Sequence, residues 1–129
     1  MRTYQRILCT VGTAAAVTVT MSTNAWAGTD CYTRAENFYA SMVSFTADGE
    51  WVSIIDEEAD GHSAVAIVDV NTGTPATYTL WNAQGAGTQK LYDFDLPEGT
   101  PVAIQACTGE YGTKTVIWSS CGPVAFGEA

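Results

Sequence analysis

Turn residues divide most of this chain into short segments of the kind that form β-strands. Gly, Pro, Asn and Asp recur about every eight to twelve positions, and the segments between them are rich in Val, Ile, Thr and Tyr. Such spacing leaves no room for helical crossovers, so we expect mostly antiparallel strands. The pattern predicts about seven short strands, at 51–56, 62–70, 76–81, 89–96, 102–106, 113–119 and 123–126.

These strands predict an all-β fold, an antiparallel β-sandwich of immunoglobulin-like character, with a small barrel as the alternative. The segment 62–70 is apolar on both faces, as in a central strand. The Cys, Trp and Cys spacing of true immunoglobulin domains is absent, so the prediction covers the architecture alone. We expect the sandwich domain over 47–129, and the near-helical spacing of apolar residues predicts a short helix or a loose arm over 28–46.

The first 27 residues (1–27) have the order of a secretory signal peptide. Arg2 and Arg6 give a positive start, residues 7–20 carry no charge, and Ala25-Trp26-Ala27 is a small-x-small cleavage site. The apolar stretch is too short to span a bilayer as a stable helix, and no later stretch reaches that length. We therefore expect a secreted protein, with no membrane span in the mature chain.

The chain is strongly acidic beyond the predicted cleavage site. All 14 Asp and Glu residues lie there, against only three basic residues, Arg34, Lys90 and Lys114, which gives a formal charge of −11. Such a charge repels phosphate backbones and anionic membranes. We therefore expect no nucleic-acid partner, and the acidity either keeps a secreted protein soluble or attracts a basic protein.

Three cysteines, Cys31, Cys107 and Cys121, lie beyond the cleavage site, which implies one disulfide and one remaining thiol outside the cell. All three pairings are open. The spacing favours Cys107 with Cys121, because a short segment with turn residues separates them. A tight hairpin at 109–112 would place Cys107 opposite Lys114, so this pairing needs a wider loop or a bulge, or else Cys31 is a partner.

No set of catalytic residues is recognisable in the sequence. Gly61-His62-Ser63-Ala64-Val65 begins like a nucleophile elbow but lacks the final Gly. His62 is the only histidine, so no second one exists to serve as the base of a Ser-His-Asp triad. One histidine is also too few for an ordinary zinc site.

Acidic residues at 56–60 resemble the opening of a calcium loop. Asp56, Glu58 and Asp60 occupy the first, third and fifth positions, and Gly61 the sixth. Ile67 stands where an EF-hand needs a bidentate Glu, which excludes that motif. We expect no cofactor, and a looser calcium site in this turn is the alternative to a solvated turn.

Aromatic residues are the main candidates for a binding surface, because flat rings stack on sugars and anchor protein contacts. Trp51 and Trp118 lie among Val and Ile and are expected in the core. Trp81, with its neighbour Asn82, borders a Gly-rich loop, and Tyr111 lies in a turn beside Glu110. We therefore take as binding candidates Trp81, Asn82, Glu110 and Tyr111.

Four stretches carry a resemblance to known proteins. They are Ala59-Asp60-Gly61-His62-Ser63-Ala64-Val65-Ala66, Trp81-Asn82 followed by Gly85, Gly87 and Thr88, Glu98-Gly99-Thr100-Pro101-Val102, and Ala106-Cys107 followed by Gly109-Glu110-Tyr111. Over roughly 51–121 the chain resembles small secreted proteins of filamentous actinobacteria, a largely uncharacterised group. The resemblance implies no named activity, and it implies that Cys107 and Cys121 are bridged.

Three functions are compatible with these features. The first is a secreted, non-enzymatic β-sandwich protein that binds an extracellular polysaccharide or protein. The second is an inhibitor or toxin-like effector of a secreted enzyme, with the turn between Cys107 and Cys121 as the reactive loop. The third is a small hydrolase that uses carboxylates.

Overall fold

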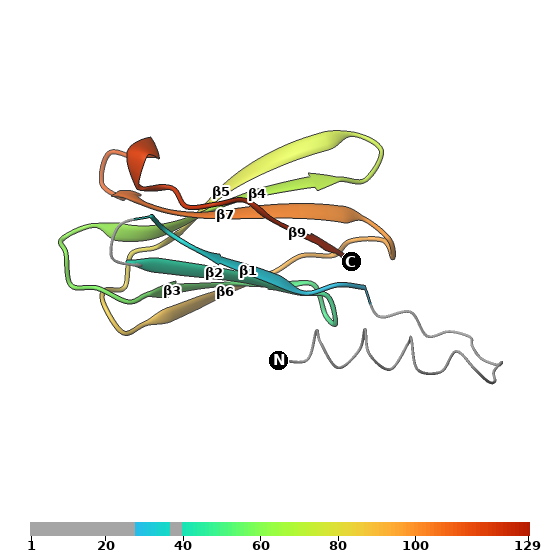
Figure 1. Cartoon of the computed structure of the whole chain (residues 1–129), viewed down its shortest axis with the longest axis horizontal. Helices are drawn as coiled ribbons and strands as arrows, with labels where there is room; N and C mark the ends of the chain where they lie inside the picture. The colour runs from blue at the N-terminus through green and yellow to red at the C-terminus, as the bar shows by residue number, and fades with distance from the viewer. Residues whose placement is uncertain (1–27, 37–39) are drawn as a thin grey trace, which may run out of the picture.

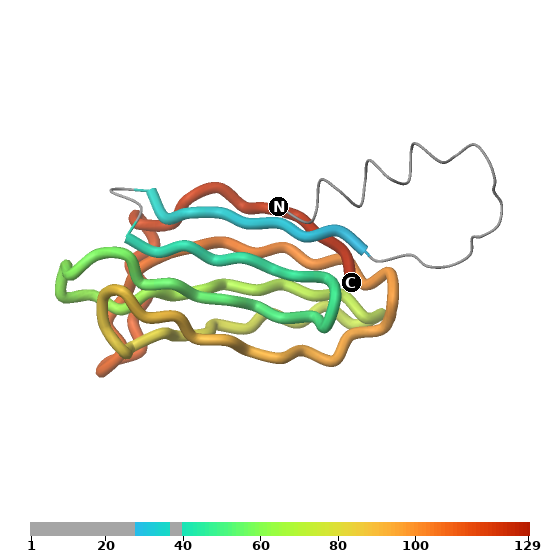
Figure 2. The backbone as a smooth tube through the Cα atoms, turned by 90° about the horizontal axis from the view of Figure 1, so that it is seen from below, coloured from blue at the N-terminus to red at the C-terminus, as the bar shows by residue number. Residues whose placement is uncertain are grey.

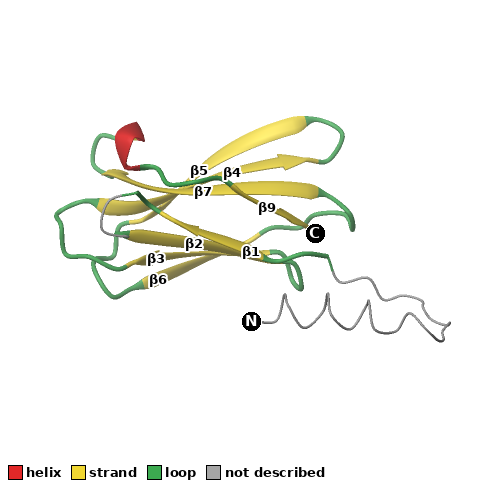
Figure 3. Cartoon of the chain, in the orientation of Figure 1, coloured by secondary structure: helices red, strands yellow, loops and turns green. Residues whose placement is uncertain are grey.

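The computed structural model describes residues 28–36 and 40–129, so the predicted signal peptide lies outside the described residues. The described chain is all-β, and its strands form two antiparallel sheets that lie face to face (Figures 1 and 3). One 3₁₀ turn, η3 (Trp118–Ser120), is the only helical element of this part. The strands are β1 (Cys31–Arg34), β2 (Ser41–Thr46), β3 (Trp51–Asp56), β4 (Ser63–Asn71), β5 (Pro75–Asn82), β6 (Gln89–Asp93), β7 (Pro101–Glu110), β8 (Thr115–Ile117) and β9 (Ala125–Glu128).

The two sheets contain four and five strands. The first has the order β1-β2-β3-β6, and the second has the order β5-β4-β7-β8, with β9 on the same edge of β7 as β8. The chain crosses between the sheets after β3, after β5 and after β6. Figure 2 shows the strands of both sheets running along one long axis, which is the aligned type of sheet packing. The prediction of an all-β, sandwich-like fold is thereby confirmed.

The core forms where alternate side chains of the two sheets meet. Burial of each Val, Ile or Phe stabilises the fold by about 1.5–3 kcal/mol, so this layer is the main stabilising contact between the sheets. Its buried members include Val43, Phe45, Val52 and Ile54 from the first sheet and Ala66, Val68, Ile104 and Ala106 from the second.

Strand β4 lies between β5 and β7, and its residues Ala64 to Val68 are buried on both faces. This confirms the central position that its apolar sequence predicts. On the outer face of the second sheet, β4 belongs to a second apolar cluster, formed by Val65, Ile67, Trp81 and Cys107 with Val116 and Cys121 packed against it.

A disulfide joins Cys107 to Cys121, which confirms the pairing that the sequence favours. Residues 111–114 form a four-residue loop between β7 and β8, and a regular continuation of this hairpin would place Trp118 opposite Cys107. The turn η3 interrupts the strand there and brings Cys121 to Cys107 instead. Cys31 is the free cysteine of the described chain.

The expectation of a short helix or loose arm over 28–46 is wrong for the described residues, because β1 and β2 are strands of the first sheet. From Ser41 onward, side chains alternate between buried and half-buried, with Val43 and Phe45 in the core. This period of two decides the structure, since it buries apolar side chains against the second sheet. The two added strands raise the count from about seven to nine.

The two ends of the described chain close one side of the sandwich. Thr29 and Glu128 exchange two backbone hydrogen bonds, of 2.8 and 3.0 Å. Beside them lies Gly127, where an added Cβ would come 2.6 Å from the Thr29 carbonyl oxygen and 3.0 Å from the Cys31 Sγ. The absence of a side chain at this position lets β9 approach the amino end of β1.

We predict that Gly127→Ala destabilises the protein by about 1–3 kcal/mol, because the methyl group must displace a backbone carbonyl. Urea unfolding measures this loss. Gly112→Ala is the matched control, since a Cβ there meets nothing within 4 Å. Equal stability of the two variants would contradict the close approach of β9 to β1.

Candidate binding surface

An open groove of about 980 Å³ runs across the outer face of the first sheet. Its lining comes mainly from the outward-facing residues of all four strands, which we call the groove residues: Tyr32, Arg34, Met42, Ser44, Thr46, Trp51, Ser53, Ile55, Gln89 and Leu91. Because successive side chains of a strand point to opposite faces, these residues alternate in sequence with the core residues of the same strands. The groove and the core are therefore two faces of one sheet.

Cross-strand pairing aligns the groove residues in rows. One row crosses β1, β2, β3 and β6 and consists of four residues, each opposite the next: Tyr32, Ser44, Ser53 and Leu91. The two serines are small and form the floor of this row, while the exposed Tyr32 and Leu91 stand at its ends. Trp51, also exposed, lies in the neighbouring row, between Thr46 of β2 and Asp93 of β6. The row thus has a low centre between raised apolar ends.

Polar groups of the groove are held by neighbours. The Gln89 Nε2 donates to the Ser53 Oγ at 2.6 Å. The Arg34 guanidinium forms an ion pair with Glu57. At the other end, the Asp30 carboxylate accepts a hydrogen bond from the Ala47 N–H at 2.8 Å. Ligand sites typically combine exposed apolar rings, which supply affinity, with a few fixed polar groups, which orient the ligand. The groove has both kinds of group.

Cys31 lies at the same end of the groove, and its chemistry argues against a catalytic thiol. Burial, with a smaller contribution from the negative charge of Asp30, raises the pKa of Cys31 to about 12. The thiolate is the reactive form of cysteine, and at neutral pH almost none is present at this pKa.

Three of the four aromatic residues considered in the sequence analysis differ from expectation in their burial. Trp81 is only 9% exposed, so the expectation of an exposed ring there is wrong. Trp51 and Trp118 were expected in the core, and they are 39% and 64% exposed. Tyr111 is exposed as expected. The difference at Trp81 arises because its ring covers the outer face of β4, beside the disulfide.

Asn82 is fully buried, and its side chain organises the loop between β5 and β6. Its Nδ2 donates to the carbonyl oxygens of Ile54 and Thr88, each at 3.1 Å. Its Oδ1 accepts from the Gln84 N–H at 3.0 Å and from the Thr88 Oγ1 at 3.3 Å. Because both donors and the acceptor of this amide are already used, the Asn82 side chain serves to hold the loop in place.

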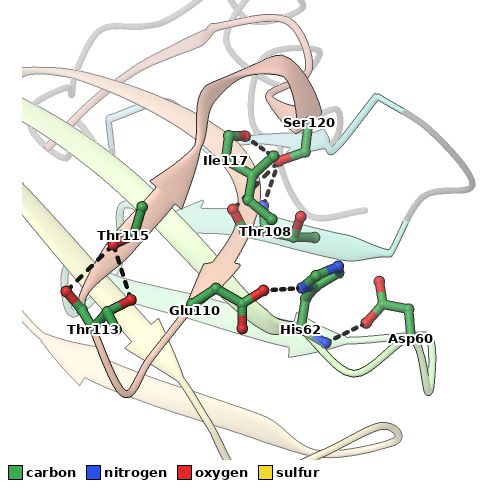
Figure 4. A network of polar contacts seen from close by, with 8 residues as sticks. All are labelled: Asp60, His62, Thr108, Glu110, Thr113, Thr115, Ile117 and Ser120. Carbon is green, nitrogen blue, oxygen red and sulfur yellow. Dashed lines mark hydrogen bonds and ion pairs between the residues drawn. The ribbon is translucent and has the colours of Figure 1, made fainter.

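Glu110 and Tyr111 lie at the free end of the β7–β8 hairpin and have separate partners. The Glu110 Oε2 lies 2.5 Å from the His62 Nδ1, as Figure 4 shows. The Tyr111 ring packs edge-to-face on Trp81, with centroids 5.8 Å apart, and the Lys114 Nζ lies 3.4 Å above the Tyr111 centroid. The structure therefore places Tyr111 against Trp81, while Asn82 faces the interior and Glu110 faces His62.

Ser120 joins the turn after β8 to β7 in the same region (Figure 4). Its Oγ accepts from the Thr108 N–H at 2.8 Å and donates to the Ile117 carbonyl oxygen at 2.6 Å. These bonds satisfy backbone groups next to the disulfide.

The acidic turn does not gather into a metal cluster. Within the described ranges, no three His, Cys, Asp or Glu residues lie close enough together to hold a metal ion. Asp56 is buried and accepts a hydrogen bond from the Glu58 N–H at 3.3 Å, while Asp60 accepts from the His62 N–H at 2.9 Å. The structure thus assigns Asp56 and Asp60 local turn contacts.

The groove residues were missed by the sequence reasoning, which sought exposed rings in loops. Their signal is the alternation of 41–46 and 51–55, where every second residue faces outward. No protein-family model, curated protein or solved structure matched the chain. Across residues 28–36 and 40–129 the structure contains no helix with the length and apolarity needed to cross a membrane.

We predict that Asn82→Ala lowers the free energy of unfolding by about 2 kcal/mol or more, because it removes four hydrogen bonds of a fully buried side chain and leaves a cavity in its place. Thermal unfolding measures the loss, at about 4–8 °C per kcal/mol for a domain of this size. Asn71→Ala is the control, since the exposed Asn71 accepts one hydrogen bond, from the Gly73 N–H within the turn. A loss no greater than that of the control would refute the structural role.

We predict that Asp56→Asn stabilises the protein at neutral pH. Burial is the largest influence on the pKa of Asp56 and raises it, against a smaller lowering by the Glu58 N–H. The folded state therefore binds this proton more tightly than the unfolded state, and stability falls as the pH rises through the folded pKa. Above that pH the carboxylate carries its full desolvation cost, which an amide avoids.

Urea unfolding of Asp56→Asn at pH 7 and at acidic pH tests this sign. The gain should be present at pH 7 and shrink as the pH falls below the folded pKa. Asp93→Asn, at an exposed position, should show no comparable gain. A stability gain that grows on acidification would mean that the charged form is favoured in the folded protein.

Proposed function

We propose that the protein is exported and that its sandwich has immunoglobulin-like strand order. The order β2-β3-β6 in one sheet and β5-β4-β7-β8 in the other corresponds to strands A-B-E and C′-C-F-G. Strand β1 is then an addition at the edge of the first sheet. Export is supported by the charged, apolar and small-residue order of 1–27 and by the Cys107–Cys121 disulfide, since disulfides persist in oxidising compartments.

We propose further that the protein is non-enzymatic and binds an extended polysaccharide chain in the groove of the first sheet. The observation that carries this proposal is the exposure of Tyr32, Trp51 and Leu91 on one sheet face around a floor of serines. Sugar rings have apolar C–H faces that stack on aromatic rings, and hydroxyls that need hydrogen-bonding partners. The groove offers both kinds of group.

The dimensions and openness of the groove favour a chain over a small ligand. Four strands span about 14 Å from the axis of the first to that of the last. A small-molecule site encloses most of its ligand, whereas this groove is open along the sheet. A polysaccharide can lie across such a surface, with its chain continuing beyond the groove at both ends.

Charge narrows the class of polysaccharide. The formal charge of −11 beyond residue 27 repels sulfated and uronic-acid polymers at low salt. A neutral or basic polysaccharide meets no such repulsion. We therefore favour neutral chains, for which binding would depend little on ionic strength.

The β7–β8 hairpin supports the second candidate, an inhibitor of a secreted enzyme. The disulfide constrains this hairpin at its base, and its tip carries the exposed Tyr111 and the Lys114 that covers its ring. A constrained loop loses little entropy on entering an active site. A second reading of the groove itself is a docking surface for a protein.

Retention on insoluble chitin and cellulose in about 0.5 M salt, where charge effects are largely screened, tests the polysaccharide proposal. Trp51→Ala and Tyr32→Ala should each weaken binding about fivefold or more, the loss expected from one stacking contact of about 1 kcal/mol. Trp118→Ala is the control, because Trp118 is more exposed than Trp51 and lies outside the groove lining.

Equal losses in all three variants would show non-specific adsorption through exposed rings. Absence of retention on any neutral polysaccharide would refute the proposal. If the protein then inhibited a secreted protease, and Lys114→Ala relieved the inhibition while Trp51→Ala did not, the second candidate would replace the first.

A further inference from the structure

Strand β5 forms an open edge of the second sheet. It pairs with β4 on one side, and no strand of the described chain pairs with its other side. The eight residues Pro75–Asn82 carry no charge, and their pairing with β4 runs without a bulge. Natural edge strands are usually protected from pairing by charged residues, prolines, bulges or shortness, and of these β5 has only the proline at its first position.

One hydrogen bond identifies the backbone groups that point outward from this edge. The Tyr92 Oη, which comes from the other sheet, donates to the Trp81 carbonyl oxygen at 2.7 Å. In an antiparallel strand the N–H and C=O of one residue point to the same side, and alternate residues point to opposite sides. Pro75, Thr77, Thr79 and Trp81 therefore direct their backbone groups away from β4.

These outward groups differ at the two ends of the strand. Pro75 has a carbonyl group but no N–H to offer. Trp81 has an N–H, but its carbonyl oxygen is already occupied by Tyr92. Between them, Thr77 and Thr79 each present one donor and one acceptor. The edge thus lacks a donor at one end and an acceptor at the other.

We propose that β5 pairs with β5 of a second copy of this chain, antiparallel and about a two-fold axis at Tyr78. In this register Thr77 lies opposite Thr79 of the second copy, and Pro75 lies opposite Trp81 of the second copy. The missing donor of Pro75 then faces the occupied acceptor of Trp81. Every remaining outward donor meets an acceptor, which gives six hydrogen bonds across the axis.

Side chains agree with this register. Tyr78 is 44% exposed and meets its own counterpart at the axis, in the non-hydrogen-bonded kind of pair that brings side chains closest. Thr77 and Thr79 form Thr–Thr pairs on the outer face, a favourable cross-strand combination. A two-fold interface requires such self-complementarity. Thr77 contacts Thr79 of the second copy, and Thr79 contacts Thr77 of the second copy.

Charge favours a second copy at this edge over other faces of the molecule. With 14 acidic and three basic residues beyond residue 27, two copies repel each other over most of their surfaces. The β5 strand itself carries no charge. Asp69 of the neighbouring β4 lies opposite Thr77 and accepts a hydrogen bond from the Thr77 Oγ1 at 2.6 Å on the outer face. Salt should therefore strengthen association by screening the remaining repulsion.

Sedimentation equilibrium of the purified protein tests the proposal. We expect a dimer with a dissociation constant on the order of 100 μM, since one strand pairing buries less area than a standard interface. The constant should fall as salt is raised from about 0.05 to about 0.5 M. A protein that stays monomeric at about 1 mM in about 0.5 M salt, well above that constant, would overturn the proposal.

Substitutions at the axis test the register. Tyr78→Lys and Tyr78→Glu should each abolish dimerisation, because like charges then face each other, and an equimolar mixture of the two should form a heterodimer. Val124→Lys and Val124→Glu are the matched controls, since Val124 is 45% exposed and lies away from β5. Circular dichroism confirms that each variant folds.

Amide hydrogen exchange of the unmodified chain gives a reading that does not depend on variants. Exchange of the Thr77, Thr79 and Trp81 N–H groups should slow as protein concentration rises, while that of exposed loop amides stays constant. If other amides became protected with rising concentration while the exchange rates of these three amides stayed the same, the dimer would form through another surface. Dimerisation of Tyr78→Lys alone and of Tyr78→Glu alone would lead to the same conclusion.

Discussion

Burial of β4 on both of its faces is the constraint on which the rest of the structure depends. Its inner side chains, Ala64, Ala66 and Val68, meet the first sheet. Its outer side chains, Val65 and Ile67, would face solvent if nothing covered the second sheet. Trp81 and the disulfide supply that cover. The β7–β8 hairpin, the turn η3 and the Tyr111–Trp81 contact follow from the need to complete this outer cluster.

Much of the fold could be predicted from the sequence, because apolar alternation and turn residues reinforce each other after residue 47. The strand 51–56 and the central segment 62–70 are cases in which both signals agree. The prediction failed over 28–46, where Ala35 and Met42 fit a helical period while Val43 and Phe45 fit a period of two. Pairing with β3 decides between them, and a single segment contains no information about a partner strand.

The candidate site was less predictable, for a physical reason that the tryptophans illustrate. Trp51 and Trp81 both stand in strands among β-branched residues. Which one is buried depends on what covers the outer face of each sheet. The second sheet has the disulfide-linked turn above it, and the first sheet has an open groove. Local sequence specifies which residues share a face, and only the packing of distant segments specifies whether that face is covered.

The difference between the two outer faces is also the strongest reason to regard the groove as functional. An outer sheet face with no ligand would be expected to carry polar and charged side chains, as solvated antiparallel sheets do. Besides polar residues such as Ser44 and Gln89, the first sheet presents the exposed Tyr32, Trp51 and Leu91, at a cost in solubility that the acidic residues elsewhere offset. Strand β1 adds to this argument. The immunoglobulin-like order that we propose is complete without it, and its outward residues, Tyr32 and Arg34, both line the groove. A strand that widens an already sufficient sheet, and supplies a ring and a cation to its open face, is consistent with the proposal that this face binds a ligand.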